Sequence, residues 1–360
     1  MKIQYNKNIS YFLNLNTYEN NKKQKKEKID YLNFLTSHHY INCKEYKKII
    51  DIKTDKFKIT SINDLPYIPT GLFKNFDLRS VPRNKIYKTL YSSGTSNQTP
   101  SKIFLDKFTS SLQSKVLIKS FNYIFGIERM PMIIIDNNDS INSSSNFSAR
   151  GAGIAGFSIF STERHYVLDN NMNLIINKIK KLSNKKNKKY LIFGFTYVVW
   201  KSLLNYLKKN KLTIDLSSSI LVHGGGWKKL EELNISNIQF KKEIKKYLNI
   251  KKVFNYYGMV EQTGSIYFEC EKGFFHTSIF NDVIIRDKNN LKILKKNNSG
   301  LVQAISLIPH SYPGHSILTD DLGEIYGEDT CKCGLHGKYF KIYGRNKNAE
   351  IRGCSNVIEN

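Results

Sequence analysis

Residues 91–102 bring together hydroxyl side chains, a glycine and a closing lysine, in the order Tyr-Ser-Ser-Gly-Thr-Ser-Asn-Gln-Thr-Pro-Ser-Lys. Such a loop can wrap a polyphosphate, because no bulky side chain keeps the main-chain N–H groups away from it. The candidate phosphate contacts are Ser92, Ser93, Gly94, Thr95, Ser96 and Lys102. The spacing Gly-x-x-x-x-Gly-Lys-Ser/Thr is absent, so the segment is not a Walker loop. Taken alone, it is better explained as a solvated turn between two strands.

Two further segments have residues suited to a nucleotide. Gly224, Gly225 and Gly226 follow the strand-like Leu221-Val-His223, and glycines at the end of a parallel strand let the backbone approach a flat base. A glycine-rich turn before a helix explains them equally well. In the second segment, Tyr256, Tyr257 and Gly258 precede Glu261. A tyrosine can stack on a purine and the glutamate can hold Mg²⁺ against phosphate oxygens, although Glu261 also suits an ordinary ion pair.

The five cysteines suggest a metal site more than disulfides, because their number is odd and two of them form a Cys-x-Cys pair. Cys331 and Cys333, with His336 nearby, supply half of a zinc site that Cys270 and His276 can complete. The spacing is tighter than the usual Cys-x₂-Cys, and reduced thiols in a β-rich region are the alternative. This cysteine usage, and a start without the apolar segment of a signal peptide, favour a cytoplasmic protein.

The composition raises the possibility of nucleic-acid binding, because the net charge is +26. Only 8 of the 56 basic residues are arginine, and lysine is enriched together with asparagine, isoleucine and tyrosine. A compositional trend of the source explains this better than a polyanion-binding surface. The charge should still attract acidic partners and nucleotides non-specifically. No run of about eighteen apolar residues exists, so no membrane span is expected.

The elements that must position these residues alternate between strands and helices. We expect strands over 88–91 and 102–105 around the polar loop, then strands over 132–136, 190–193, 220–223 and 253–256, and helices over 197–207 and 239–247. A long polar loop is expected over 137–150. This alternation predicts an α/β fold with a largely parallel sheet. Lysine-rich helices are expected over residues 1–60, and short strands after residue 263 predict a smaller β-rich subdomain.

Four motifs in order between residues 91 and 353 resemble those of the adenylate-forming superfamily. They are the polar loop, Tyr257-Gly-Met-Val-Glu261, Thr319-Asp-Asp321 and Gly344-Arg345. Four positions depart from the family pattern: Asn97 replaces a glycine, Ser101 separates Pro100 from Lys102, Val260 replaces a threonine, and Asn348 stands where the family often has aspartate. The resemblance implies ATP and Mg²⁺ as cofactors.

The resemblance also implies roles for residues near the end of the chain. Asp321 would grip the ribose hydroxyls through charge-assisted hydrogen bonds, and Arg345 would approach the ribose and phosphate. The implied architecture is a large N-terminal domain over 1–343, with mixed and parallel sheets flanked by helices. It includes the helical part over 1–60 and the β-rich subdomain over about 264–343. A hinge-derived tail over 344–360 follows, with the usual C-terminal domain truncated.

Within the superfamily the chain is similar to the LuxE-type acyl-protein synthetases, through residues 146–158, 311–319 and the early end. That likeness implies activation of a fatty acid as acyl-adenylate, transfer to the enzyme's cysteine, for which Cys354 is the candidate, and delivery to a partner reductase. Glycines and aromatic residues of 149–157 and 193–195 would line the acyl pocket. The phenylacetate-CoA ligase-like branch carries a similar Cys/His set, which supports structural zinc.

Two other functions remain open from the sequence. One is an acyl- or aryl-CoA ligase, or another adenylating enzyme, of the phenylacetate-CoA ligase-like branch, which would need no cysteine acceptor. The other is a basic polyanion-binding protein on a degenerate nucleotide fold, which would bind DNA with a steep salt dependence.

Overall fold

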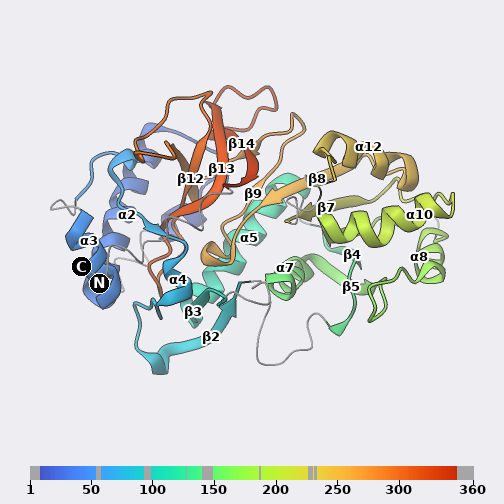
Figure 1. Cartoon of the computed structure of the whole chain (residues 1–360), viewed down its shortest axis with the longest axis horizontal. Coiled ribbons are helices and arrows are strands. Elements are labelled where there is room, and N and C mark those ends of the chain that lie inside the picture. Colours follow the sequence, from blue (N-terminus) through green and yellow to red (C-terminus); the bar gives the residue numbers. More distant parts are fainter. Residues whose placement is uncertain are drawn as a thin grey trace. The chain divides into compact units, whose positions relative to one another are not determined.

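A computed structural model describes most of the chain (Figure 1). The described residues are 9–53, 58–92, 99–126, 128–139, 149–185, 188–225, 230 and 233–346. The chain divides into two compact units. Unit 1 consists of Met1–Tyr123 and Gly258–Asn360, and unit 2 is the inserted segment Ile124–Tyr257. Within the described residues, no helix has both the length and the apolar character needed to cross a membrane.

Unit 1 is built on a largely antiparallel sheet in the order β10-β14-β13-β12-β11. The strands are β10 (Phe275–His276), β11 (Asn281–Arg286), β12 (Gly300–Ser306), β13 (Ser316–Glu328) and β14 (Lys338–Arg345), and β1 (Ile68–Pro69) pairs in parallel with β13. A separate hairpin joins β2 (Ile86–Tyr91) to β3 (Lys102–Asp106). The strand β9 (Tyr267–Phe268) is also part of this unit.

The helices of unit 1 supply part of its hydrophobic core. The longest, α2 (Lys22–Asn42), begins with a capping box in which Asn21 and Gln24 each accept the other's backbone N–H. Its residues Tyr31, Leu32 and Leu35 are buried in a core that includes residues of β11 and β12. The other helices are α3 (Lys44–Lys53), α4 (Leu72–Asn75) and α5 (Lys107–Phe125), with short 3₁₀ turns η1 (Ile62–Asp64), η2 (Arg83–Lys85) and η5 (Val260–Gln262).

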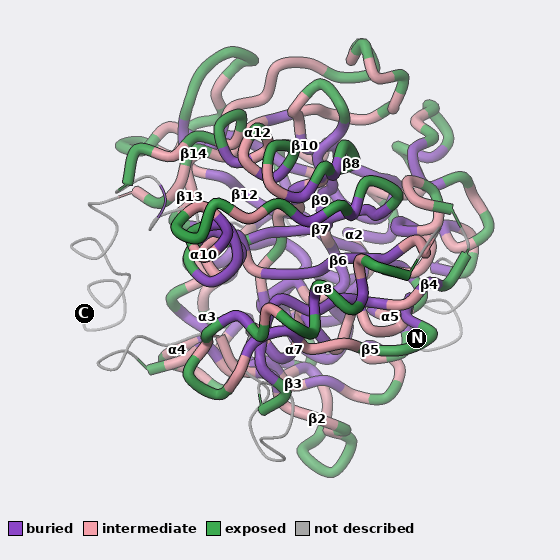
Figure 2. Tube along the Cα trace, turned by 90° about the vertical axis from the view of Figure 1, so that its right-hand side faces the viewer, coloured by how far each residue is buried: buried purple, intermediate pink, exposed green. Residues whose placement is uncertain are grey.

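Unit 2 has a parallel sheet in the order β5-β4-β6-β7-β8. Its strands are β4 (Met130–Ile134), β5 (Ser161–Tyr166), β6 (Leu191–Phe195), β7 (Ile220–Gly224) and β8 (Lys252–Tyr257). Figure 2 shows β6 and β7 as buried, which is expected where helices cover both faces of a parallel sheet. The covering elements are α7 (Ala149–Phe157), η3 (Ser158–Phe160), α8 (Ile176–Ser183), α9 (Thr196–Val198), η4 (Val199–Leu204), α10 (Asn205–Lys209) and α12 (Asn237–Leu248).

Most of the predicted elements are confirmed with small changes at their ends. The strands expected over 190–193, 220–223 and 253–256 are β6, β7 and β8, and the helix over 239–247 is α12. The predicted helix over 197–207 is continuous but has a π-helical middle, η4. The predicted polar loop over 137–150 is wrong at its end, because α7 begins at Ala149 and buries Ile154 and Phe157 on one face. Residues 140–148 of that loop lie outside the described residues.

Candidate functional site

The base of the polar loop in unit 1 is held by hydrogen bonds on both sides. Tyr91 and Lys102 pair across the β2–β3 hairpin. Beyond them, the Ser92 N–H donates to the Ser101 carbonyl at 3.1 Å, and the Ser101 N–H donates to Ser92 Oγ at 2.8 Å. The structure therefore brings Ser92 and Lys102 to the same end of the hairpin. The other predicted phosphate contacts, Ser93, Gly94, Thr95 and Ser96, lie outside the described residues.

Lys102 forms an ion pair with Asp77, with Nζ 3.5 Å from Oδ1. Both side chains are about two-fifths exposed, at 42% and 44%. An ion pair this exposed contributes little to stability, about 1 kcal/mol or less. Asp77 therefore holds the ammonium group of Lys102 only weakly.

Glu261 is a buried carboxylate on the η5 turn, with only 8% of its surface exposed. Burial raises its pKa, and a side-chain hydrogen bond with Ser101 and the positive charge of Arg345 oppose that rise. The turn itself is fixed by its neighbour Gln262, whose Nε2 donates to the carbonyls of Ala304 and Gly314, each at 2.9 Å. These two bonds fix the backbone of the turn directly after Glu261.

Asp321 and Arg345 are register partners on the adjacent strands β13 and β14. Arg345 Nε lies 3.7 Å from Asp321 Oδ1, and the arginine side chain is 72% exposed. The Asp321 carboxylate is mostly buried. Its negative charge raises the pKa of Glu261, whereas the positive charge of Arg345 lowers it. Unit 1 thus brings together Glu261, Asp321 and Arg345, which belong to three separate sequence motifs. The effect of Ser101 on the Glu261 pKa was not predicted from the sequence.

In unit 2, the predicted glycines Gly224 and Gly225 lie at the carboxyl end of β7. Gly224 pairs with Tyr256 of β8, and a Cβ at position 224 would come within 2.6 Å of the Tyr256 carbonyl oxygen and ring. Only glycine fits there. Gly225 has φ +67°, a region that glycine adopts without strain. Gly226 lies outside the described residues.

Aromatic rings gather around Tyr256. The Phe157 and Phe193 rings stack at 4.6 Å between centroids, and Tyr256 lies 5.2 Å from Phe157 and 6.2 Å from Phe193. A Cβ on Gly153 would lie 3.1 Å from the Phe195 ring. The two segments predicted to line an acyl pocket, 149–157 and 193–195, therefore lie together in unit 2. Burial raises the Tyr256 pKa, so the phenol stays neutral within this aromatic cluster.

The Tyr256 ring, which was predicted to contact a nucleotide base, is packed against phenylalanine rings. Its ring already contacts phenylalanines, whereas Tyr257 follows it in the strand and points to the opposite side of the sheet. Gly258 comes next, and a Cβ there would lie 2.9 Å from Ile266. Either tyrosine ring therefore remains a candidate to contact a base.

Sequence reasoning missed an ion pair in unit 2. Asp136, which is 1% exposed, follows β4, and Arg150 Nε of α7 lies 3.0 Å from its Oδ2. Two features of the sequence could have indicated this ion pair. They are a carboxylate shortly after a buried strand and an arginine in the 146–158 motif. The contact joins the end of β4 to the start of α7.

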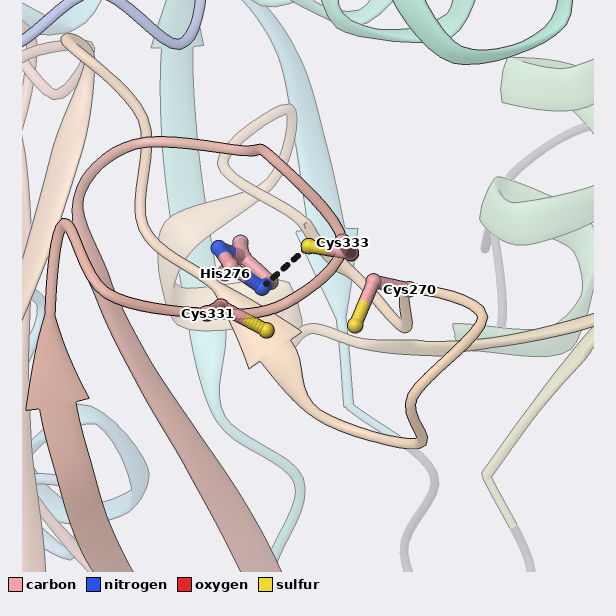
Figure 3. Close-up of side chains that lie close together, drawn as sticks. All are labelled: Cys270, His276, Cys331 and Cys333. Atoms are coloured by element: carbon pink, nitrogen blue, oxygen red, sulfur yellow. Dashed lines mark hydrogen bonds between the residues drawn. The ribbon is translucent and has the colours of Figure 1, made fainter.

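Four side chains of unit 1 converge as the sequence predicted (Figure 3). The ligand atoms of Cys270, His276, Cys331 and Cys333 all lie within 4.8 Å of one another, and Cys333 Sγ is 3.3 Å from His276 Nε2. His276 is on β10, Cys270 precedes that strand, and the other two cysteines lie in the β13–β14 connection. Burial lowers the pKa of His276 to about 4, which leaves the imidazole neutral. His336, which the sequence placed near this site, is outside the set. Its Nδ1 lies 3.6 Å from Asp329 Oδ1.

The candidate acyl acceptor Cys354 lies outside the described residues. The structure therefore leaves its role as a prediction.

Comparison with known proteins identifies the family and the fold. The family described as "Acyl-protein synthetase, LuxE" matches residues 7–360. The long-chain-fatty-acid–luciferin-component ligase of Photorhabdus luminescens is 38% identical over 58 residues, 16% of this chain. The matched region spans 50% of that relative's length.

Solved structures of 2-hydroxyisobutyryl-CoA ligase share the fold. The postadenylation state with 2-HIB-AMP has a TM-score of 0.71 and 13% identity, covering 92% of this chain and 70% of that one. The open conformation with 2-HIB-AMP and CoA has a TM-score of 0.69 and 13% identity, covering 89% and 69%. At this identity the likeness establishes the fold alone, and it confirms the predicted α/β class of adenylate-forming ligases. The chain belongs to the LuxE family of acyl-protein synthetases.

Proposed function

We propose that the protein is an ATP-dependent ligase that activates a fatty acid as acyl-adenylate, takes the acyl group onto Cys354 and passes it to a partner reductase. Membership of the acyl-protein synthetase family over residues 7–360 is the observation that carries this proposal. The grouping of Glu261, Asp321 and Arg345 in unit 1 supports it. We place the reaction in the cytoplasm, where thiols stay reduced.

In the first step, a carboxylate oxygen of the fatty acid bonds to the α-phosphorus of ATP and pyrophosphate leaves. Positioning and charge neutralisation do most of the work in such phosphoryl chemistry. We assign the terminal phosphates to Lys102 and the 92–96 segment, and the ribose to Asp321 with Arg345 beside it. The exposure of Arg345 suits contact with a ligand.

Glu261 fits a Mg²⁺ ligand, because magnesium in nucleotide sites is commonly held by one or two carboxylates together with phosphate oxygens. When bound, Mg²⁺ neutralises charge on the phosphates. The protein's own contribution is to place this carboxylate in a buried position. Burial raises its pKa, and Ser101 and Arg345 oppose that rise, so both favour the ionised form.

In the second step, the Cys354 thiolate attacks the acyl carbon of the mixed anhydride and AMP leaves, which forms a thioester. The aromatic cluster of Phe157, Phe193, Phe195 and Tyr256 is our candidate for the lining near the acyl carboxyl end. A reductase then receives the acyl group.

We also propose that Cys270, His276, Cys331 and Cys333 hold a structural zinc ion. Ligand atoms of a tetrahedral zinc lie roughly 3.5–4 Å apart, since zinc–ligand bonds are about 2.0–2.3 Å long. The observed separations of at most 4.8 Å need only small side-chain movements to reach that spacing. Zinc would join β10 to the β13–β14 connection, and no catalytic step is assigned to it.

Pyrophosphate exchange into ATP, measured against a panel of carboxylic acids with and without CoA and hydroxylamine, tests the function. We expect exchange with a long-chain fatty acid, and acyl label on the protein that hydroxylamine releases. Immediate formation of a CoA ester would instead establish an acyl-CoA ligase. No exchange with any acid, by folded and zinc-replete protein, would contradict the proposal and leave polyanion binding as the alternative.

A further inference from the structure

Unit 1 contains a cavity of about 380 Å³ beside the first turns of α2. Its walls come from α2, from residues 60–63, from the segment between β10 and β11, and from the connection that leads into β14. A cavity of this size is within the range of small-molecule sites. Among the described residues, none of those assigned above to ATP, Mg²⁺, zinc or the acyl chain lines it.

Three charged side chains that line the cavity are mostly buried. They are Lys28, Asp282 and Lys338, with side-chain exposures of 14%, 14% and 18%. Lys338 Nζ lies 2.8 Å from Asp282 Oδ1, whereas Lys28 Nζ lies 4.0 Å from Asp282 Oδ2. Burial raises the pKa of the Asp282 carboxyl, but the charges of Lys338 and Lys28 outweigh burial and lower it overall. With both lysines in their ammonium form, the group carries one positive charge in excess.

Lys28 also has a hydrogen-bond donor to spare. Its Nζ donates to the carbonyls of Ser278 at 3.1 Å and Asn281 at 3.0 Å, and the Asp282 carboxylate at 4.0 Å is beyond hydrogen-bond distance. An ammonium group has three N–H donors, so one of them lacks a close acceptor within the described part of the chain. Burial lowers the pKa of Lys28, and an anion in the cavity would oppose that effect.

Gln24 supplies a second donor, one turn before Lys28 on the same face of α2. It lines the cavity and is only 3% exposed. Its Oε1 accepts the Asn21 N–H at 2.8 Å in the capping box, which fixes the orientation of the amide. The Nε2 atom is buried, and no described residue accepts a hydrogen bond from it. Burying such a donor without an acceptor is costly, so a ligand that supplies one would gain affinity.

The rest of the lining suits an uncharged, apolar ligand body. Four apolar residues line the cavity: Phe12, Ile29, Ile62 and Ile279. The other charged residues of the lining are exposed, so solvent weakens their effect. Lys25 and Glu328 are paired with each other at 2.7 Å, and Glu19 lies at the end of the chain segment that leads into α2.

We propose that this cavity is a binding site for a small organic carboxylate, whose oxygens accept hydrogen bonds from Lys28 and Gln24 and whose body contacts the four apolar residues. A carboxylate has one negative charge and two acceptor oxygens, which match the single excess charge and the two donors. A bound carboxylate would connect α2 to β11 and would therefore stabilise unit 1. The inference does not depend on the proposed ligase reaction.

Binding of benzoate and hexanoate, each compared with its uncharged amide, tests the proposal. Calorimetric titration of the full chain at constant ionic strength measures the affinity, and thermal unfolding measures the stabilisation. We expect saturable binding of at least one carboxylate, and roughly tenfold or weaker binding of its amide, because hydrogen bonds to a charged group are lost. Binding of neither carboxylate, equal binding of the amide, or equal stabilisation by inorganic phosphate would overturn the proposal.

Gln24→Glu assigns that binding to the cavity. Glutamate can accept the Asn21 N–H as glutamine does, and a helix N-terminus favours a negative charge, so the variant should fold. It replaces the N–H₂ donor by an oxygen that repels a carboxylate. We expect the melting temperature without probe to be unchanged or higher, and the affinity for the probe to fall roughly tenfold or more. Lys28→Met, which removes the charge and keeps the chain length, should cause a similar loss. Unchanged affinity in either variant would overturn the proposal.

Gln239→Glu is the matched control, because Gln239 is the third residue of α12 as Gln24 is of α2. Its N–H donates to Ser236 Oγ at 3.2 Å, and its side chain is exposed in unit 2. The same change of charge at this helix start should leave the affinity for the probe unchanged. An equal loss of affinity in Gln24→Glu and Gln239→Glu would show that net charge alone is responsible, and would overturn the proposal.

Discussion

The imidazole rings of His38 and His310 stack in unit 1 with centroids 4.1 Å apart. A second stacked pair, His39 and His315, adjoins them, with centroids 4.9 Å apart and both residues fully buried. Half of the eight histidines in the chain are therefore in one buried cluster. His39 bonds to Ser80, and His315 contacts Thr36 and Tyr46.

This histidine cluster predicts a loss of stability in mild acid. Burial lowers the pKa of His38, His39 and His315, the last to about 3 from its usual 6.5. The unfolded chain therefore binds protons first as the pH falls below 6.5. The contribution of each histidine to the free energy of unfolding is complete above pH 6.5. It declines by about 1.4 kcal/mol per pH unit as the pH falls toward the pKa of the folded state.

Denaturant unfolding at pH 7.5, 6.0 and 5.0 checks this prediction. His315→Gln should be less stable at pH 7.5 and show a smaller loss between pH 7.5 and 5.0. The carboxylate of Asp106 lies 3.9 Å from His310 Nδ1, and its charge partly opposes the lowering of the His38 pKa by burial. A pH dependence equal to that of wild type would show that His315 does not titrate on unfolding.

Gly224→Ala should destabilise unit 2. The added Cβ would lie 2.6 Å from the Tyr256 carbonyl oxygen, and backbone cannot move aside as a side chain can. Overpacking of this kind costs roughly 1–3 kcal/mol in the free energy of unfolding. Gly71→Ala is the control, because no atom lies within 4 Å of a Cβ there and its φ of −55° suits alanine. Equal stability of the two variants would contradict the packing described.

Cys331→Ser should abolish zinc binding and lower the melting temperature by roughly 5 °C or more. Metal analysis of the purified protein, together with thermal unfolding, measures both effects. Cys43→Ser is the control, because Cys43 is a buried cysteine outside the set. It should lose stability but keep its zinc. Wild-type protein that binds no zinc when the metal is supplied would refute the zinc site.

Cys354→Ser should separate the two half-reactions. Adenylation does not use the thiol, so ATP–pyrophosphate exchange should stay within about twofold of wild type. The protein should retain no acyl label that hydroxylamine releases. Labelling with radioactive fatty acid, followed by gel analysis, measures the acyl label retained on the protein. Loss of exchange in a folded variant, or normal labelling, would rule out Cys354 as the acceptor.

The local order of strands, helices and motifs was available from the sequence. Buried β-strand runs such as Leu191–Phe195 and the glycines after Leu221 carry their own signals, because hydrophobic period and glycine content are local properties. The Cys/His set was also predictable, since these residue types have few other reasons to recur together. The start of α7 was missed because several serines and asparagines precede Ala149, and each of them could cap a helix, so the sequence does not single out one start.

Tertiary structure alone decided which distant residues meet. Asp321 and Arg345 belong to separate motifs, and only the register of β13 against β14 makes them partners. Four histidines spread over residues 38–315 formed no motif, and long-range packing made them one cluster. Tyr256 fitted a nucleotide motif, but the side of the sheet it faces depends on strand register. Such contacts depend on burial and register across the whole fold, which no local pattern encodes.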